Sequence, residues 1–437
     1  MKKRKARKRK QRIPFIALLL ILSLVGSGCG DNRQTKDSAQ ASQTERADTA
    51  SKEGIMSHGY FFEEDGIVVS SRERFLYSDW EPVEFDYICM DPTCTHRTEK
   101  CSARTIQDEN GMLKDFSLVY QDRLIILHAY LQLTVNELSE TVQEWNHVYQ
   151  TDVYEADPDG SNRRKVAAFS GSLGSLTMSY AAVLVDGKLY FGGPSKERIR
   201  MLYDAQGQYL TYEEWIDDGI YCLDLNDYTL ETFAVTENKE VKEEEGYQYQ
   251  LYEYDGMVYG TISNFQGGDA VWYRIDPEAG ICEEILRFDS NAAWFGGAIG
   301  DKVYYFYEDN GETLYVRDLA AGAEEREVVT ITAEGMIAMP FVLDGQLLLI
   351  TDFLLEGENH MAEYTVLDPE GKELDRIRYD EYINFLDVVG DRLIYFKPDS
   401  DSNWETWWVD KEDLADLSEK GVRIGPGIGE SLDTLDK

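Results

Sequence analysis

Asp255-Gly256-Met257-Val258-Tyr259 is one copy of the short pattern that decides the fold of this chain. In each copy an acidic or glycine-containing turn is followed by a strand rich in apolar residues. Seven copies occur, at 65–69, 122–126, 186–190, 255–259, 300–305, 344–348 and 390–395, and the last four are 46, 43 and 47 residues apart, measured between their aspartates. Asp-Gly turns between apolar runs are typical of β-hairpins. The pattern therefore predicts a repeated antiparallel unit.

Each copy is followed by a second turn, often Asp-Pro, as at Asp157-Pro158 and Asp276-Pro277. Two hairpin turns and a spacing near 45 residues fit four short strands per unit, which is the size of a propeller blade. We therefore predict an all-β chain folded as a β-propeller with seven four-stranded blades. Six or eight blades stay open, because the first three spacings are 57, 64 and 69 residues. In this unit the first turn joins strands one and two, and the second joins strands three and four.

The second and third units carry their extra length between strands two and three, at 131–146 and 194–217. Loops in that position lie on the face opposite the Asp-Gly and Asp-Pro turns, where such scaffolds place binding sites. Aromatic residues beside carboxylates suit sugar or peptide recognition. The predicted ligand-binding residues are Trp145, Tyr209, Tyr212 and Trp215. The alternative is that these rings pack the loops onto the blades.

The N-terminus has the features of an export signal. The first twelve residues include nine Lys or Arg, and residues 13–25 form an apolar run that only Ser23 interrupts. That run is shorter than the roughly 20 residues needed to span a bilayer, and it ends in small residues before Cys29. The segment 24–29 resembles the bacterial lipobox, which implies acylation of Cys29 and removal of residues 1–28. An ordinary secretory signal or an uncleaved anchor is the alternative.

Four segments follow from these signals: the signal peptide at 1–28, a tether at 29–54, a propeller at 55–423 and a tail at 424–437. Residues 30–54 contain no Val, Ile, Leu or aromatic residue, so we expect a disordered tether. Export and lipidation would hold the propeller at the cell membrane on its extracytoplasmic side.

The charge excludes one class of partner. The formal net charge is −39, and removing the nine positive charges of the signal peptide gives −39 − 9 = −48. Such an acidic chain is not expected to bind nucleic acid.

The sequence also lacks an H-E-x-x-H motif, a G-x-S-x-G elbow and a Walker loop. We therefore expect a binding module for a glycan, a peptide or a partner protein. The alternative is a polysaccharide hydrolase or lyase that uses paired carboxylates.

One compact cluster could hold a metal: Cys89, Cys94, His96 and Cys101. Three thiols and an imidazole within thirteen residues could close around a tetrahedral Zn²⁺. Outside the cell a disulfide with one spare thiol is the alternative. A closed set of four ligands leaves no position for a substrate, so either interpretation predicts a structural site. We expect the cluster at the turn between the third and fourth strands of the first unit.

The repeat across 55–423 resembles propeller-bearing lipoproteins of anaerobic Gram-positive bacteria. In pattern it is also similar to TolB-like and low-density-lipoprotein-receptor-type propellers. The resemblance implies a lipid-anchored, extracytoplasmic β-propeller, and it assigns no activity, because much of this lipoprotein group has none assigned.

Overall fold

The structure is a computed structural model, and it describes residues 52–57, 59–71, 73–106, 115–139, 141–170, 182–241, 247–264, 270–288, 293–307, 310–320, 323–330, 340–356, 359–399 and 403–426. The predicted signal peptide and Cys29 lie outside these residues, as does nearly all of the predicted tether and tail. Within the described ranges, no helix combines the length and the apolar character needed to cross a membrane.

The described residues form strands almost throughout. The strands of the first three units are β1 (Lys52–Ser57), β2 (Tyr60–Glu63), β3 (Gly66–Ser70), β4 (Phe75–Asp79), β5 (Asp86–Tyr87), β6 (Asp115–Tyr120), β7 (Arg123–Ser139), β8 (Val142–Ala156), β9 (Arg164–Ser170), β10 (Ala182–Val185), β11 (Lys188–Asp204), β12 (Tyr209–Asp224) and β13 (Leu230–Val241). The next two units comprise β14 (Tyr247–Tyr254), β15 (Met257–Asn264), β16 (Ala270–Asp276), β17 (Ile281–Phe288), β18 (Ala293–Ile299), β19 (Lys302–Tyr307), β20 (Asn310–Asp318) and β21 (Arg326–Thr330). The last two comprise β22 (Phe341–Leu343), β23 (Gln346–Glu356), β24 (Asn359–Leu367), β25 (Glu373–Tyr379), β26 (Asn384–Val389), β27 (Arg392–Pro398), β28 (Trp404–Asp410), a 3-10 helix η3 (Lys411–Asp416), α1 (Leu417–Lys420) and β29 (Val422–Pro426).

The Asp-Gly turns make the hairpins that the repeat predicts. Asp255 and Gly256 both have positive φ, 52° and 74°, and the turns at 186–187 and 344–345 have the same character. Two successive positive φ values define the hairpin turn whose twist matches that of its strands. Asp tolerates this region better than most residues, and Gly adopts it freely. Each such turn joins the first strand of a unit to its second.

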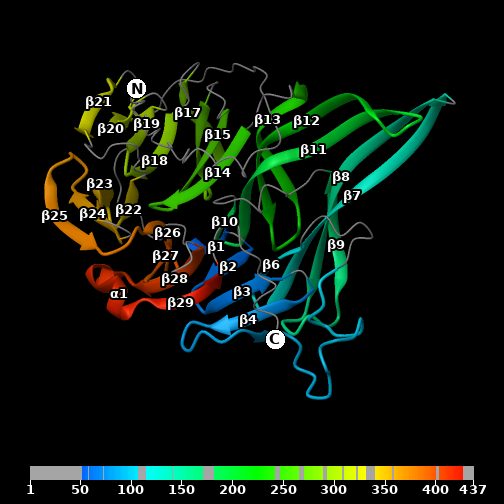
Figure 1. Ribbon diagram of the computed structural model, residues 1–437, viewed down its shortest axis with the longest axis horizontal. Coiled ribbons are helices and arrows are strands. Elements are labelled where there is room, and N and C mark those ends of the chain that lie inside the picture. Colours follow the sequence, from blue (N-terminus) through cyan, green and yellow to red (C-terminus); the bar gives the residue numbers. More distant parts are fainter. Residues whose placement is uncertain are drawn as a thin grey trace, which may run out of the picture.

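The predicted β-propeller class is confirmed by the topology. Strands β14 to β29 form four separate four-stranded antiparallel sheets, each of four consecutive strands. The innermost strands contact one another in the closed order β1, β10, β14, β18, β22, β26 and again β1. Tyr60 Oη donates to the carbonyl of Pro426 at 3.0 Å, which ties the first blade to the last. Figure 1 shows the sheets arranged around a common centre.

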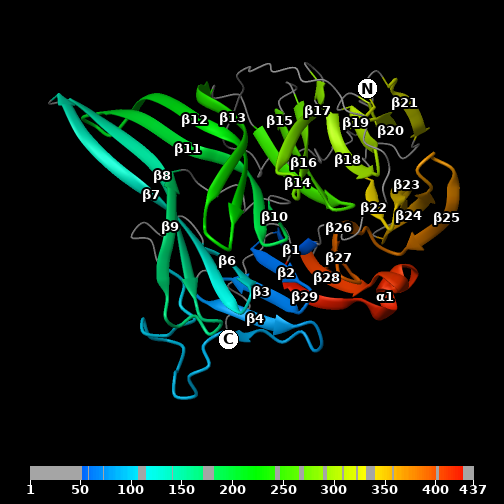
Figure 2. The same ribbon diagram turned by 180° about the vertical axis from the view of Figure 1, so that it is seen from behind.

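The first three units depart from a regular ring. Strand β1 pairs with β2 on one side and with β10 on the other, so the first and third blades form one continuous sheet. The sheet β6–β9, here called the outer sheet, does not supply a strand to the closed order of inner strands, and β6 contacts β3. Both views place the outer sheet at the rim of the molecule (Figures 1 and 2). The predicted number of seven blades therefore stays a prediction.

Two cores cover the two faces of the continuous sheet. Phe61, Val68 and Phe75 pack against the outer sheet, in one cluster with Phe116 and Leu118 of β6. Their alternating neighbours, such as Phe62 and Val69, join the core of the ring with side chains of the last and fourth blades. Because both faces are covered, β3 is buried along its whole length.

The extra length of the second and third units is strand, which corrects the prediction of loops at 131–146 and 194–217. Strands β7 and β8 continue past the outer sheet as one long hairpin, and β11 and β12 continue as another. The two hairpins pair through β8 and β11 over Arg198–Asp204 and Val142–Val148. Strand pairing gives hydrogen-bond partners to backbone N–H and C=O groups that in loops would bind water. We call this extension, residues 129–150 and 194–217, the arm (Figure 1).

The strands extend beyond both predicted limits of the propeller, residues 55 and 423. Strand β1 begins at Lys52, within the segment predicted as tether, and β29 ends at Pro426, within the predicted tail. Pairing fixes both segments: Lys52 lies opposite Val185, and Glu405 lies opposite Pro426. The Glu53 carboxylate also accepts a hydrogen bond from the backbone N–H of Gly187 at 2.5 Å.

Candidate metal centre

The Cys/His cluster lies in the connection between β5 and β6, at the border of the first blade and the outer sheet. This corrects the prediction that it occupies a turn between the third and fourth strands. In the first unit the Asp65-Gly66 turn joins β2 to β3, so the third and fourth strands of the predicted unit are β4 and β5. Residues 80–85 join these two strands, and the cluster begins after β5 ends at Tyr87. The Asp91-Pro92 dipeptide therefore belongs to an irregular segment.

The connection brings the four predicted ligands together. One sulfur each of Cys89, Cys94 and Cys101 and one ring nitrogen of His96 all lie within 4.8 Å of one another. The Sγ of Cys101 is 3.5 Å from the Nδ1 of His96. All three cysteines are free thiols, and Cys101 is buried while the other two are half-buried.

Turns within the connection set this convergence. The N–H of Cys94 donates to the carbonyl of Asp91 at 3.0 Å, and the N–H of Cys101 donates to the carbonyl of Thr98 at 3.1 Å. His96 takes a positive φ of 56°, which reverses the chain between the two turns. Its N–H donates to the Sγ of Cys94 at 3.4 Å.

Two neighbours that the sequence analysis did not identify hold His96 in place. Tyr87 stacks on its imidazole, with ring centroids 4.6 Å apart and an interplanar angle of 28°. Arg74, which is only 6% exposed, donates from Nε to the His96 carbonyl at 2.7 Å. Such supporting contacts fix the orientation of a ligand. Neither residue lies in the motif, so its spacing gave no signal for them.

The thiols differ in acidity. Burial raises the pKa of the Cys101 thiol to about 11. Burial also acts to raise the pKa of Cys89, but hydrogen bonds from Ser102, the Asp91 backbone and the neighbouring thiols outweigh it, and its pKa is lowered. Cys222 and Cys282 lie outside the cluster in β12 and β17, and burial raises the pKa of each to about 12.

The segment that follows Cys101 is fastened to the outer sheet. Ser102 Oγ donates to the carbonyl of Asp159 at 2.6 Å, in the turn between β8 and β9. Arg163 donates from Nη2 to the carbonyls of Ser102 and Arg104, both at 2.9 Å. At Gly160 a Cβ would lie 2.2 Å from the Ser102 carbonyl oxygen, so only glycine permits this approach. The cluster thus lies where the two sheets are joined.

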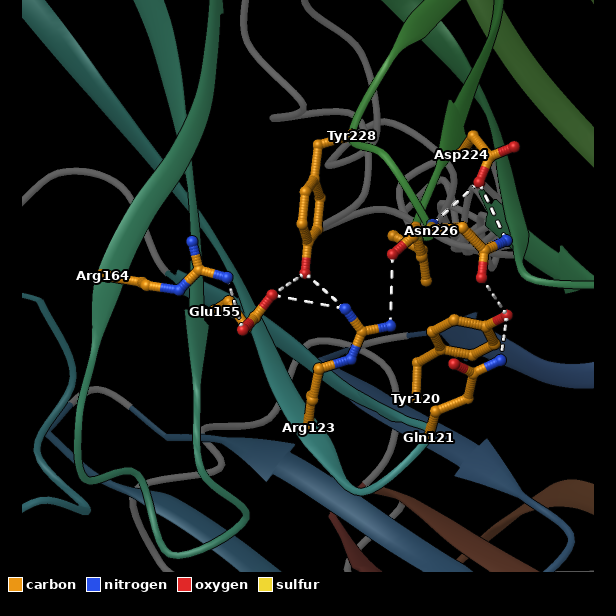
Figure 3. A network of polar contacts seen from close by, with 9 residues as sticks. Tyr120, Gln121, Arg123, Glu155, Arg164, Asp224, Asn226 and Tyr228 are labelled. Carbon is orange, nitrogen blue, oxygen red and sulfur yellow. Dashed lines mark hydrogen bonds and ion pairs between the residues drawn. The ribbon is translucent and has the colours of Figure 1, made fainter.

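A second junction connects the outer sheet to the third blade (Figure 3). Tyr228, in the turn between β12 and β13, donates to the carboxylate of Glu155 in β8. Arg123 donates to the Tyr228 hydroxyl at 3.0 Å and to Glu155 at 3.3 Å, and Arg164 pairs with the other carboxylate oxygen at 2.9 Å. These contacts lower the pKa of Glu155, with the Tyr228 hydrogen bond as the largest favourable contribution.

The arm does not unite the four predicted ligand-binding aromatic residues. Trp145 lies opposite Val135 and Met201 in the register, and its ring contacts Tyr203 at a centroid distance of 5.4 Å. Trp215 points to the other face, where the Arg198 guanidinium lies 4.6 Å from its ring centroid. The side chains of Tyr209 and Tyr212 lie outside the described part of the chain.

A cavity of about 320 Å³ lies at the Asp-Gly turn end of four inner strands, β14, β18, β22 and β26. Its carboxylates cap turns: Glu253 accepts the Gly256 N–H at 2.7 Å, and Asp255 accepts the Gly300 N–H at 3.1 Å. Asp344 pairs with Lys411 at 3.2 Å. The cavity is therefore on the face opposite the one predicted to bind ligand, and each of these three carboxylates has a hydrogen-bond or ion-pair partner.

No protein-family model and no curated protein matches the chain. Solved structures that resemble it include a prolyl endopeptidase, with 12% identity, 86% of this chain and 50% of that chain covered, and a TM-score of 0.40. An oligogalacturonate lyase from Vibrio parahaemolyticus has 9% identity, 70% and 87% coverage and a TM-score of 0.37. TolB from Acinetobacter baumannii has 10% identity, 65% and 77% coverage and a TM-score of 0.29. The chain spans about half the length of the prolyl endopeptidase. At these scores the similarities carry no functional argument, and the fold rests on the strand topology of the chain itself.

Proposed function

We propose that this chain is an exported, lipid-anchored recognition module that binds an extended segment of a partner protein along the edge of the arm. The observation that carries the proposal is the free edge of β7. Within the described residues, β7 pairs with β6 only as far as His128, and from Ala129 to Ser139 it pairs on one side alone, with β8. A long strand edge with unpaired backbone groups is a template for strand addition.

The side chains of this edge favour an apolar partner segment. Leu133, Val135 and Leu138 are 40%, 45% and 52% exposed and lie within six residues of one strand. Exposed apolar side chains that are grouped in this way are typical of interaction sites. Glu137 is the one charged residue of this edge between Ala129 and Ser139. Natural edge strands are commonly protected by Lys or Pro, and this edge has neither.

A partner protein fits the arm better than a glycan or a second copy. Sugar recognition needs open aromatic faces, whereas the Trp145 ring packs against Tyr203 and the Trp215 ring is covered by Arg198. A second copy would bring together two chains that, without residues 1–28, each carry a formal charge of −39 − 9 = −48. The same charge favours a neutral or basic partner segment.

A library of random linear peptides displayed on phage tests the proposal. We expect wild-type protein to enrich peptides with alternating apolar residues. A variant with Leu133→Lys, Val135→Lys and Leu138→Lys should bind them at least tenfold more weakly, because charged side chains block strand addition. Leu374→Lys, at an exposed leucine of β25, is the matched control and should bind as wild type does. Failure to enrich any peptide, or equal binding by the triple variant, would contradict the proposal.

The membrane anchor has its own test. Lipidation of Cys29 and loss of residues 1–28 predict a mature mass with a diacylglyceryl addition and recovery in the membrane fraction. Cys29→Ser should lose the lipid mass and leave the membrane fraction or keep the precursor mass. If the variant and the wild type have the same processing and distribution, the chain is not a lipoprotein.

A further inference from the structure

We propose that one Zn²⁺ binds in tetrahedral coordination to three thiolates and one imidazole, those of Cys89, Cys94, Cys101 and His96. This inference does not depend on the proposed function of the arm. It follows from the geometry of the connection between β5 and β6 and from the contacts that surround it.

The spacing of the donor atoms fits a tetrahedral zinc site. With Zn–S bonds of about 2.3 Å and Zn–N bonds of about 2.0 Å, tetrahedral ligands lie about 3.8 Å apart for two sulfurs and about 3.5 Å apart for sulfur and nitrogen. Cys101 Sγ and His96 Nδ1 are 3.5 Å apart, and all four donor atoms lie within 4.8 Å of one another. Small movements of half-buried side chains would close the remaining gaps.

The donor set selects the metal. Thiolates and imidazole prefer zinc over the hard cations Ca²⁺ and Mg²⁺, which require oxygen ligands. Three thiolates, a neutral imidazole and Zn²⁺ carry a net charge of −1. The buried guanidinium of Arg74, which donates to the His96 carbonyl and pairs with Glu73 at 3.5 Å, is a positive charge beside this loop. The backbone N–H of His96 also donates to Cys94 Sγ, and such a hydrogen bond stabilises a metal-bound thiolate.

A metal explains the convergence better than a disulfide. A disulfide requires two sulfurs about 2.0 Å apart and leaves the third thiol and the imidazole without a role. Here the three sulfurs and one imidazole nitrogen lie within 4.8 Å of one another. Tyr87 stacks on that imidazole, and Arg74 holds the backbone of His96 through its carbonyl. Four ligands that close on one point are the arrangement of a structural zinc site.

The metal would stabilise a junction that has little regular structure. Residues 88–106 contain no strand of the named sheets, and Arg74 and Arg104 form only an isolated bridge. Yet this segment holds the first blade to the outer sheet through Ser102 and Arg163. Binding of a metal to folded ligands adds to the folding free energy. Zinc would therefore fix the outer sheet, and with it the arm, against the ring.

Metal content of the full chain, purified without chelator or added metal, tests the proposal. We expect about one zinc per chain by inductively coupled plasma mass spectrometry. Replacement by Co²⁺ should give the absorption bands of a tetrahedral thiolate site. Cys94→Ser should lower zinc affinity by at least tenfold. Cys282→Ser, at a half-buried cysteine outside the cluster, should keep one zinc.

A second measurement on the wild-type chain remains decisive if Cys94→Ser does not fold. After denaturation in chelator without reductant, alkylation should label all three cysteines of the peptide that contains Cys89, Cys94 and Cys101. Chelation of the folded chain should lower its melting temperature, and zinc should restore it. A disulfide within that peptide, or three free thiols without bound zinc, would overturn the proposal.

Discussion

Ile55 of β1 lies directly opposite Val183 of β10, so the first and third blades share one continuous sheet. This pairing closes the inner ring without a strand from the second unit. The outer sheet consequently packs on the rim, where the Cys/His connection and the Glu155 network hold it from two sides. The arm extends from this sheet and from the third blade, so its position depends on both junctions.

Gly160 is expected to be essential for the first junction. Gly160 and Gly207 have the same φ of +74°, but only at Gly160 would a Cβ meet a backbone oxygen, that of Ser102. Gly160→Ala should therefore reduce the free energy of unfolding by about 1–3 kcal/mol more than Gly207→Ala does. Urea denaturation of both variants measures the difference. Equal losses would show that the turn between β8 and β9 does not approach Ser102.

Tyr228 is expected to stabilise the second junction. Tyr228→Phe removes a hydroxyl that donates to Glu155 and accepts from Arg123, and we expect a loss of about 1–2 kcal/mol in the free energy of unfolding. Tyr130→Phe in β7 is the control, since that ring stacks on His128 instead of joining the network. The account would be wrong here if both variants were as stable as wild type.

Glu155 should make stability sensitive to acid. Its pKa is lowered in the folded chain, chiefly by the Tyr228 hydrogen bond, relative to an ordinary value of 4.5. The stabilisation is complete above about pH 4.5 and is lost as the pH falls through the lowered pKa. Melting temperatures between pH 6 and pH 3 should fall more steeply for wild type than for Glu155→Gln. If the melting temperatures of the two proteins fall equally with pH, Glu155 does not contribute to the acid sensitivity of stability.

Glu63 should act in the opposite direction. Burial, and then the neighbouring Asp65 carboxylate, raise its pKa from 4.5 to about 8. The folded chain thus holds a proton that the unfolded chain releases, and stability falls as the pH rises from 4.5 through 8. Glu63→Gln removes this cost and should gain about 1 kcal/mol at pH 8 but little at pH 4.5. A gain that does not change with pH would contradict this origin.

The repeat predicted the blades because each Asp-Gly turn sets its own hairpin by local backbone preference. The same locality explains the gaps. Pairing of Ile55 with Val183 depends on contacts between segments far apart in sequence, so the repeat pattern could not predict it. The four proposed metal ligands could be predicted together because they lie close together in the chain, whereas Arg74 is brought to His96 only by the fold. The arm was predicted as loops because pairing of β8 with β11 cannot be inferred from either hairpin alone.

A cross-link between β3 and β6 tests the central claim that the outer sheet docks on the rim of the ring. Ser70 and Ser117 face each other with their Oγ atoms 2.7 Å apart. The double variant Ser70→Cys, Ser117→Cys should form a disulfide under mild oxidation, detected as a linked peptide by mass spectrometry, and should keep a cooperative melting transition. The two single variants show whether native thiols compete. If the folded double variant forms no such link, β6 does not pack on β3, and the arrangement described for the outer sheet and its arm is wrong.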